Sequence, residues 1–202
     1  MAKIVDSAQL FPPIGNATHN ETALNFLLAC AHWIDRCNHR IGHAATWAVL
    51  LAALISAGNA VSRYALDLSS NGWLEIQWYL FGATVMLGAA TVLCHNEHVR
   101  VDLVYGRLPA KARAWIDLLG LLFFLLPFTL LVAYLAWPFF VDSWTQQEMS
   151  SNDGGLIRWP VKLAIPLGFA LLSLQGVSEV IKRAAFLAGR YNMDTHYERP
   201  LQ

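Results

Sequence analysis

The sequence predicts an all-α integral membrane protein with four transmembrane helices, preceded by an interfacial amphipathic helix and with both termini cytoplasmic. Three observations lead to this fold class. Only 14% of the 202 residues are charged, whereas soluble domains have about a quarter. Long stretches contain no Asp, Glu, Lys or Arg. The lysines and arginines that remain are concentrated on one side of the predicted membrane.

Three runs without charged residues are each long enough to cross a bilayer. They cover 41–62, 76–96 and 118–141, which are 22, 21 and 24 residues long. About 20 apolar residues in a helix span the roughly 30 Å hydrocarbon core. A fourth run, 163–178, has only 16 residues, but Lys162 beside it can extend its ammonium group to the interface. A buried soluble helix would explain one such run, whereas four in one chain favour membrane spans.

The expected elements follow one another without a separate soluble domain. They are a tail (1–17), an interfacial amphipathic helix (18–40), a four-helix membrane domain (41–188) with spans at about 43–64, 73–94, 109–141 and 160–187, and a cytoplasmic tail (189–202). Thr18 and Glu21 have capping-box spacing at the start of the first helix. Pro109 suits the first position of the third span, and we expect Pro127 to kink that span.

The segment 18–40 is too short and too polar to cross the membrane. Its apolar residues form one stripe of about three turns, and charged and polar residues crowd its end. This pattern is typical of a helix that lies in the membrane interface. Packing against a soluble partner domain is the alternative.

The distribution of Lys and Arg predicts the orientation. Eleven of these residues fall in the N-terminal part, the loop between spans two and three, and the C-terminal part, all on one side of an even-numbered bundle. The other side has three: Arg63, Arg158 and Lys162. Because cytoplasmic segments carry the excess of positive charge, both termini and the middle loop are expected to be cytoplasmic.

The chain offers little that suggests chemistry. Its formal net charge is zero, so no nucleic-acid partner is expected. Neither a nucleophile–base pair nor a phosphate-binding loop is present, and no catalytic residue is predicted. His43 and His95 lie at similar depth and could ligate a haem, as in a membrane anchor of an oxidoreductase, but two ordinary interfacial histidines are the simpler interpretation. His95 and His98 lack further zinc ligands, so no metal and no cofactor are expected.

The middle of each predicted span lacks ionisable residues, which a stand-alone ion-coupled carrier would need near the midplane. The polar residues inside the spans are small or neutral, and such groups usually serve contacts between helices. A self-sufficient small carrier is therefore the less favoured interpretation, and a protein that packs against another membrane protein is favoured.

Several motifs occur in an order typical of one family. They are "SRYAL" at the end of span one, "WLEIQWYLF" at the start of span two, "HVRVDLVYGRLP" after span two, and Trp144 with Glu148 after span three. Over about 33–183 the chain resembles the small membrane subunit of tripartite ATP-independent periplasmic (TRAP) transporters, the DctQ-like family.

The resemblance implies a multi-pass protein of the bacterial inner membrane with three partners: a large TRAP membrane subunit, a periplasmic solute-binding protein and the lipid bilayer. The small subunit would brace the large one and help to dock the loaded binding protein. The system would take up an organic acid, such as a 2-oxo acid, a lactate-like acid or another carboxylate, with sodium. A haem-bearing membrane anchor is the alternative function.

The same motifs supply the candidate site residues. Those expected to serve subunit assembly are Arg63, Tyr64, Glu75, His98, Arg100, Asp102 and Arg107. We expect Arg63 to lie close to Glu75, because one short loop joins their helices. In an extended segment His98, Arg100 and Asp102 would project to one side. Glu148 and Arg158, in the longer outer loop, are the candidates for docking the binding protein.

Overall fold

The computed structural model describes residues 19–68, 70–95, 105 and 107–192. This part of the chain forms α1 (His19–Leu66), α2 (Asn71–Cys94), α4 (Ala110–Gly120), the π-helical segment η2 (Leu121–Leu125), α5 (Leu126–Thr145) and α6 (Trp159–Leu187). Four of its helical stretches are long and apolar enough to cross a membrane. The all-α membrane fold with four spans is therefore confirmed.

Two of the expected spans each fall within a single helix. The second span was expected at 73–94 and lies in α2; the fourth was expected at 160–187 and lies in α6. Pro109 is the N-terminal cap of α4. The π-helical segment Leu121–Leu125 ends two residues before Pro127, where a kink was expected; the kink itself stays a prediction. Proline has no N–H group and its ring crowds the carbonyl group four residues earlier, so a wider turn accommodates it.

The predicted interfacial helix and the first span form one continuous helix of 48 residues. The backbone shows no break between residues 40 and 41. At about 1.5 Å per residue, α1 is about 72 Å long, which is more than twice the roughly 30 Å hydrocarbon thickness. Only part of α1 is therefore needed to cross a bilayer. The interfacial position of residues 18–40 stays a prediction.

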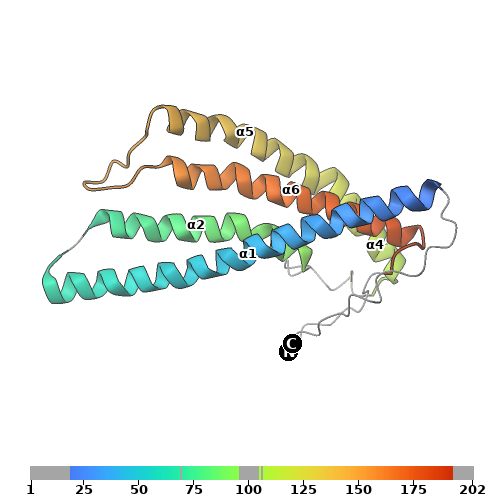
Figure 1. Cartoon of the computed structure of the whole chain (residues 1–202), viewed down its shortest axis with the longest axis horizontal. Helices are drawn as coiled ribbons and strands as arrows, with labels where there is room; N and C mark the ends of the chain where they lie inside the picture. Colours follow the sequence, from blue (N-terminus) through green and yellow to red (C-terminus); the bar gives the residue numbers. More distant parts are fainter. Residues whose placement is uncertain (1–18, 69, 96–104, 106, 193–202) are drawn as a thin grey trace.

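The helices form an open row rather than a closed bundle. Figure 1 shows the order α5, α6, α2, α1 at one end of the molecule, while at the other end α1 crosses over α6. Helix α6 contacts α1, α2, α4, η2 and α5. It accordingly contributes eleven buried residues, whereas α2 contributes only two. Helix α6 is the centre of the fold, and the other helices keep wide exposed faces.

Close backbone approach holds this row together. A Cβ atom on Gly168 of α6 would lie 2.7 Å from the carbonyl oxygen of Met86 in α2. A Cβ atom on Gly42 of α1 would lie 2.0 Å from Thr91 Oγ1. Small residues at these two crossings let the helices pack directly against each other, as is common in membranes.

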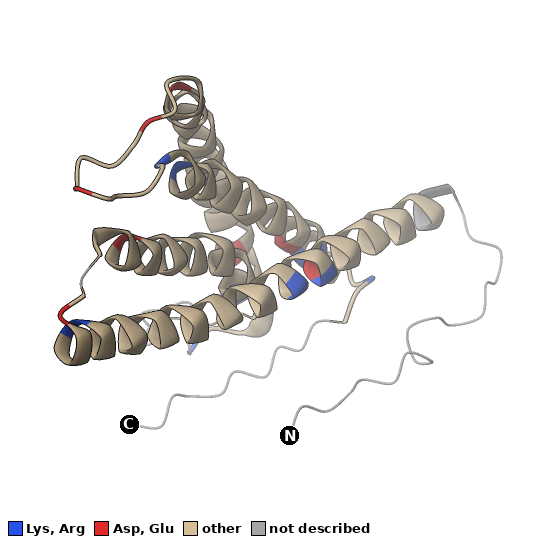
Figure 2. Cartoon of the chain, turned by 60° about the vertical axis from the view of Figure 1, so that its left-hand side comes forward, with Lys and Arg blue, Asp and Glu red and all other residues tan. Residues whose placement is uncertain are grey.

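The distribution of side chains is inverted relative to a soluble protein. The largest fully buried side chains include Arg183, Gln175 and Asn38, whereas Phe124, Trp78 and Tyr134 are more than 70% exposed. Large apolar side chains that face outward suit contact with lipid or with another membrane protein. Figure 2 shows that charged residues gather near the two loops at one end and where α1 crosses the row at the other.

Candidate functional site

Two polar clusters lie at opposite ends of the helix row. The first, which we call the ionic network, joins α1, α4 and α6. Its charged members are Asp35, Asp117, Glu179, Lys182 and Arg183, and its neutral members are Asn38, Tyr105, Gln175 and Ser178. The second is the α5–α6 hairpin, which comprises residues 146–158 together with the side chains that hold it. We refer to the two ends of the molecule as the network end and the hairpin end.

Two cations of α6 hold three carboxylates in the ionic network. Lys182 Nζ lies 3.0 Å from Asp35 Oδ2 and also donates to Glu179 Oε1. Arg183 Nε lies 3.3 Å from Asp117 Oδ2, and its Nη1 donates to Glu179 Oε2. The Arg183 and Glu179 side chains are 2% and 3% exposed. The charges are therefore paired in a nearly dry environment, where the loss of one partner is costly.

Neutral hydrogen bonds complete the link between α1 and α6. Asp35 Oδ1 accepts from Gln175 Nε2 at 2.8 Å and from Ser178 Oγ at 2.7 Å. Gln175 Oε1 in turn accepts from Asn38 Nδ2 at 2.8 Å. On the α4 side, Tyr105 donates its hydroxyl proton to Asp117 at 2.8 Å. The network fixes the position at which α1 crosses the row.

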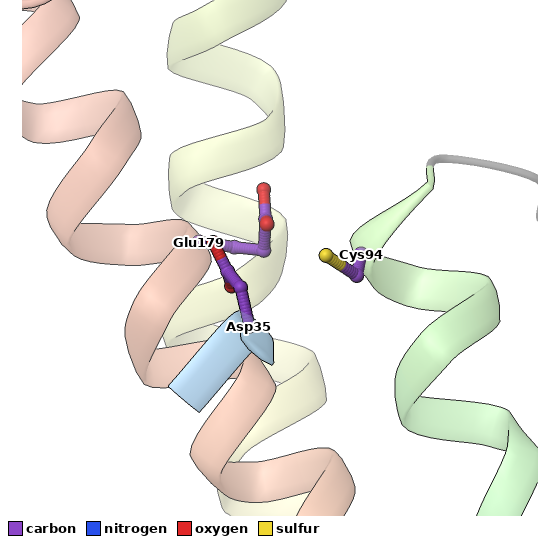
Figure 3. Close-up of side chains that lie close together, drawn as sticks. All are labelled: Asp35, Cys94 and Glu179. Carbon is purple, nitrogen blue, oxygen red and sulfur yellow. The ribbon is translucent and has the colours of Figure 1, made fainter. Parts of the chain in front are cut away.

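A thiol faces the network from α2. Figure 3 shows the Cys94 sulfur directed towards the carboxylates of Asp35 and Glu179, and the possible ligand atoms of these three residues lie within 4.8 Å of one another. The Lys182 ammonium group already bonds both carboxylates. The positive charge that such a group of ligands requires is thus supplied by a side chain, and the arrangement is explained without a metal ion.

The histidines meet differently from the arrangement considered for a haem. His43 and His95 are both exposed. The ring of His95 contacts His39, one helical turn before His43, with 5.6 Å between the ring centroids and an edge-to-face angle of 86°. The pairing across α1 and α2 is therefore an aromatic contact between His39 and His95.

The α5–α6 hairpin is a short ordered loop. Met149 and Ile157 form an antiparallel bridge, and Ser150 N donates to Leu156 O at 2.9 Å. Its turn is at Asn152–Gly155, where Gly154 has a φ of +67°. Glycine adopts this left-handed conformation without the steric cost of a Cβ atom. The turn lets the chain reverse and lie over the start of α2.

Glu75 holds this hairpin against α2. Its Oε2 accepts from the backbone N–H of Leu156 at 2.7 Å, and its Oε1 accepts from Asn152 Nδ2 at 2.7 Å and from the Ser150 hydroxyl group. Asn71, at the start of the same helix, donates to the carbonyl oxygen of Asp153 at 2.9 Å. Three donors to one carboxylate make charge-assisted hydrogen bonds, which are stronger than neutral ones.

Glu148 and Arg158 contact each other at the base of the hairpin. Arg158 Nη1 lies 3.4 Å from Glu148 Oε1, and Lys162 also donates to Glu148. The hydrogen bond from Lys162, assisted by that from Arg158, lowers the pKa of the Glu148 carboxyl below its usual range. Lys162 Nζ lies 4.0 Å from the centre of the Phe139 ring. Both predicted docking residues are therefore also part of the loop's internal structure.

The ion pair expected between Arg63 and Glu75 is absent from the part of the chain that the structure describes. Glu75 is engaged by the α5–α6 hairpin, and Arg63 has no carboxylate within 4.0 Å among the described residues. Tyr64 is 87% exposed. Arg107 is exposed in the turn before Pro109. His98, Arg100 and Asp102 lie outside the described residues, so their shared role stays a prediction.

Sequence reasoning did not identify the ionic network. Its strongest signal is on α6, where Gln175, Glu179 and Lys182 recur at i, i+4 and i+7 and so share one helix face. A polar face on a transmembrane helix indicates buried polar contacts. The partners Asp35 and Asp117 carry no such signal, because they come from distant segments of the chain.

Comparison with known protein families gives a match for this chain. The model of the family described as "Tripartite ATP-independent periplasmic transporters, DctQ component" matches residues 52–186. This match covers two thirds of the chain and includes α2, α4, η2, α5 and most of α6. No curated protein and no solved structure matched the chain.

Proposed function

The chain belongs to the family of DctQ components of TRAP transporters, and from this premise we propose that it braces the large membrane subunit and helps to dock the periplasmic binding protein. As a DctQ component it is a small permease subunit and not an enzyme. We propose that the complex takes up an organic acid, such as a 2-oxo acid or a lactate-like acid, together with sodium.

The open helix row carries the proposal of a brace. Helix α6 is buried by its neighbours, whereas α1, α2 and α5 keep large apolar side chains exposed. The ionic network fixes the crossing of α1, α4 and α6 with paired charges. A row with a fixed crossing and broad apolar faces suits a stationary support for a moving partner in the membrane.

We propose that the protein lies in the inner membrane with both termini cytoplasmic. The network end then faces the cytoplasm and the hairpin end faces the periplasm. Eleven of the fourteen Lys and Arg residues belong to segments on the cytoplasmic side of this arrangement. Reporter fusions that are active only in the periplasm should be silent at Gln202 and active near Asn152, and the reverse pattern contradicts the orientation.

Assembly with the large subunit is assigned to two sets of residues. Arg63 and Tyr64 are exposed at the hairpin end of α1, while Glu75 acts indirectly by holding the α5–α6 hairpin. The segment with His98, Arg100, Asp102 and Arg107 is proposed to serve assembly at the opposite side of the membrane. Replacement of His98 by Gln or of Asp102 by Ala should lower co-purification of the large subunit. Full assembly without transport in the His98 variant contradicts this assignment.

Docking of the binding protein is assigned to the α5–α6 hairpin, with Glu148 and Arg158 as the charged candidates. The Arg158 side chain is 40% exposed and that of Glu148 is 30% exposed, so a partner can reach both. Exposed charges at the rim of an interface mainly steer encounter and respond to salt. In an Arg158→Glu variant, excess binding protein and higher salt should each reduce the uptake defect. A defect that is indifferent to both assigns Arg158 to the brace instead.

Reconstitution tests the proposed function as a whole. The large subunit, the binding protein and a sodium gradient are combined in proteoliposomes with or without this chain. Uptake of a carboxylate solute is expected only when this chain is present, and the chain should co-purify with the large subunit. Equal uptake in its absence, or failure to co-purify, contradicts the proposal.

A further inference from the structure

The half of α1 nearest the hairpin end borders a groove between α1 and α2. The groove has a volume of ≈ 410 Å³ and is lined by Leu54, Ile55, Gly58, Asn59, Ser62 and Trp73. Its walls come from two helices that are in close contact further along their length, where Gly42 meets Thr91. At this groove α1 and α2 are further apart (Figure 1), and no other helix in the described part of the chain packs closely against α1.

An amide group that forms no hydrogen bond with any described residue lies in this groove. The Asn59 side chain makes no hydrogen bond among the described residues, whereas Thr84, Thr91 and Ser173 in the other parts of the spans each make at least one. Asn59 is seven residues before the end of α1 at Leu66, or about 10 Å along the helix axis. Because Asn59 falls inside the expected first span, 43–64, we expect this depth to lie in the hydrocarbon region, where lipid offers no hydrogen bond and an unpaired amide is costly.

The backbone beside Asn59 is open to close approach. A Cβ atom added to Gly58 would meet no heavy atom within 4 Å. At Gly168 and Gly42, by contrast, another helix of the same chain already occupies the space next to the glycine. A glycine on a membrane helix commonly lets a second helix approach closely. Gly58 offers such a surface, and no described segment of this chain uses it.

A cation at the end of the same helix face also has no partner within the described part of the chain. Arg63 follows Asn59 by four residues, so the two side chains lie on one face of α1. No carboxylate lies within ion-pair distance of Arg63 among the described residues, because Glu75 is bound to the α5–α6 hairpin. The face therefore presents a positive charge near the membrane surface and an amide group about 6 Å deeper.

We propose that this face of α1 binds a transmembrane helix of the large subunit. The partner helix packs on Gly58, carries a hydrogen-bonding side chain at the depth of Asn59, and places a carboxylate near Arg63. The inference rests on the proposed function and specifies which face of the brace is used and what chemistry its partner supplies. A lipid phosphate can pair with Arg63 near the membrane surface, so it is the Asn59 amide, at the depth of the acyl chains, that favours a protein helix over lipid at this face.

Variants of the face test the proposal through affinity for the tagged large subunit in detergent. Asn59→Leu removes the amide and should weaken binding roughly 3- to 20-fold. Gly58→Leu adds bulk and should weaken binding about tenfold or more. Gly88→Leu is the matched control, since a Cβ atom on Gly88 of α2 also meets nothing within 4 Å. Thermal melts of each purified variant alone verify that the chain folds.

A photoreactive amino acid at position 58 gives an independent measurement in the otherwise unchanged complex. A cross-link from position 58 to the large subunit, with none from position 88, supports the proposal. If the wild-type chain co-purifies with the large subunit but position 58 cross-links only to lipid or to a second copy of this chain, the inference is overturned and the proposed function stands. If the wild-type chain does not co-purify with the large subunit, both the inference and the proposed function are contradicted.

Discussion

The ionic network and the α5–α6 hairpin both join segments that are far apart in the sequence, but they use different groups in different surroundings. In the network, Arg183 and Glu179 are almost completely buried and their charges are paired. In the hairpin, one carboxylate, that of Glu75, is held by a backbone N–H group and two neutral side chains. The centre of the network is nearly dry, although Asp35 and Asp117 at its edges are partly exposed, whereas the hairpin is open to solvent.

This difference in environment sets the energetic consequences of change. A buried ion pair contributes little net stability, but the loss of one partner leaves a charge that hydrocarbon cannot solvate. An exposed pair is solvated whether or not it forms, so its loss has a small effect. The network therefore behaves as a fixed joint between α1, α4 and α6, whereas the hairpin can open without unfolding the helix row. The proposed roles, a brace for one partner and a docking surface for a transient one, require both properties.

The largest effect is expected when the network loses its most buried cation. Arg183→Met removes the charge that faces both Glu179 and Asp117, and it should destabilise the protein by about 3–5 kcal/mol. Thermal unfolding of the purified chain in detergent measures the loss. Arg190→Met is the control, because Arg190 is exposed beyond the end of α6.

A second substitution distinguishes a charge effect from a packing effect. In Arg183→Met/Glu179→Gln the buried carboxylate is removed along with its partner, and much of the lost stability should return. If the double variant is as unstable as the single one, the size and shape of Arg183 matter rather than its charge. The network would then not differ from the hairpin in the way that its buried charges suggest.

The crossing of α1 over α6 should depend on the pair formed by Asp35 and Lys182, whose atoms lie 3.0 Å apart. We expect a coupling energy of about 1–3 kcal/mol in a double-mutant cycle of Asp35→Asn and Lys182→Met. Each single variant should cost less than Arg183→Met, because Asp35 keeps the hydrogen bonds of Gln175 and Ser178. Additive effects of the two substitutions contradict a direct link between these helices.

The helices and their order could be predicted from the sequence, because a bilayer demands about 20 apolar residues for each span. That requirement, together with the residues that flank each run, placed the expected spans 73–94 and 160–187 inside α2 and α6. The sequence did not reveal that α1 is one continuous helix, since the polar residues around Arg36 and Arg40 resemble the end of a helix. The structure shows that the helix continues through them and directs Asp35 and Asn38 inward.

The joints between helices could not be predicted in the same way. Asp35 and Lys182 are 147 residues apart, and nothing in the local pattern at either position specifies the other. The proposed pairing of Arg63 with Glu75 relied on a short connecting loop. It overlooked that the hairpin could supply a backbone N–H group and two side chains to the same carboxylate. Pairing depends on how helices cross, which periodicity does not encode.

A smaller and more local effect is expected at Glu75. In Glu75→Gln the negative charge is lost and one of the two acceptor oxygens becomes an NH2 group, so the bond from Leu156 N is weakened or lost and its amide hydrogen should exchange roughly three- to tenfold faster. The unfolding temperature of the helix row should hardly change. Hydrogen exchange over residues 149–157 measures the local opening, with Asp142→Asn, another exposed carboxylate at the hairpin end, as the control. A large drop in unfolding temperature would show that the hairpin is part of the fixed joint.

The smallest effect is expected from the titration of Glu148. Because Lys162 and Arg158 lower the pKa of this carboxyl in the folded protein, the ionised form stabilises the base of the hairpin. That contribution is complete above the usual glutamate pKa of about 4.3, and it is lost as the pH falls through the lowered value. Protection against hydrogen exchange at residues 146–158, expressed relative to the intrinsic exchange rate at each pH, should therefore fall slightly more in the wild-type chain than in Glu148→Gln when the pH is reduced from about 7 to about 3. Glu75 titrates in both proteins, so the difference between them isolates Glu148. High salt should reduce this difference, since the pair with Arg158 is partly exposed. An identical pH response in the two proteins would mean that Glu148 leaves the hairpin unaffected and is available in full to an external partner.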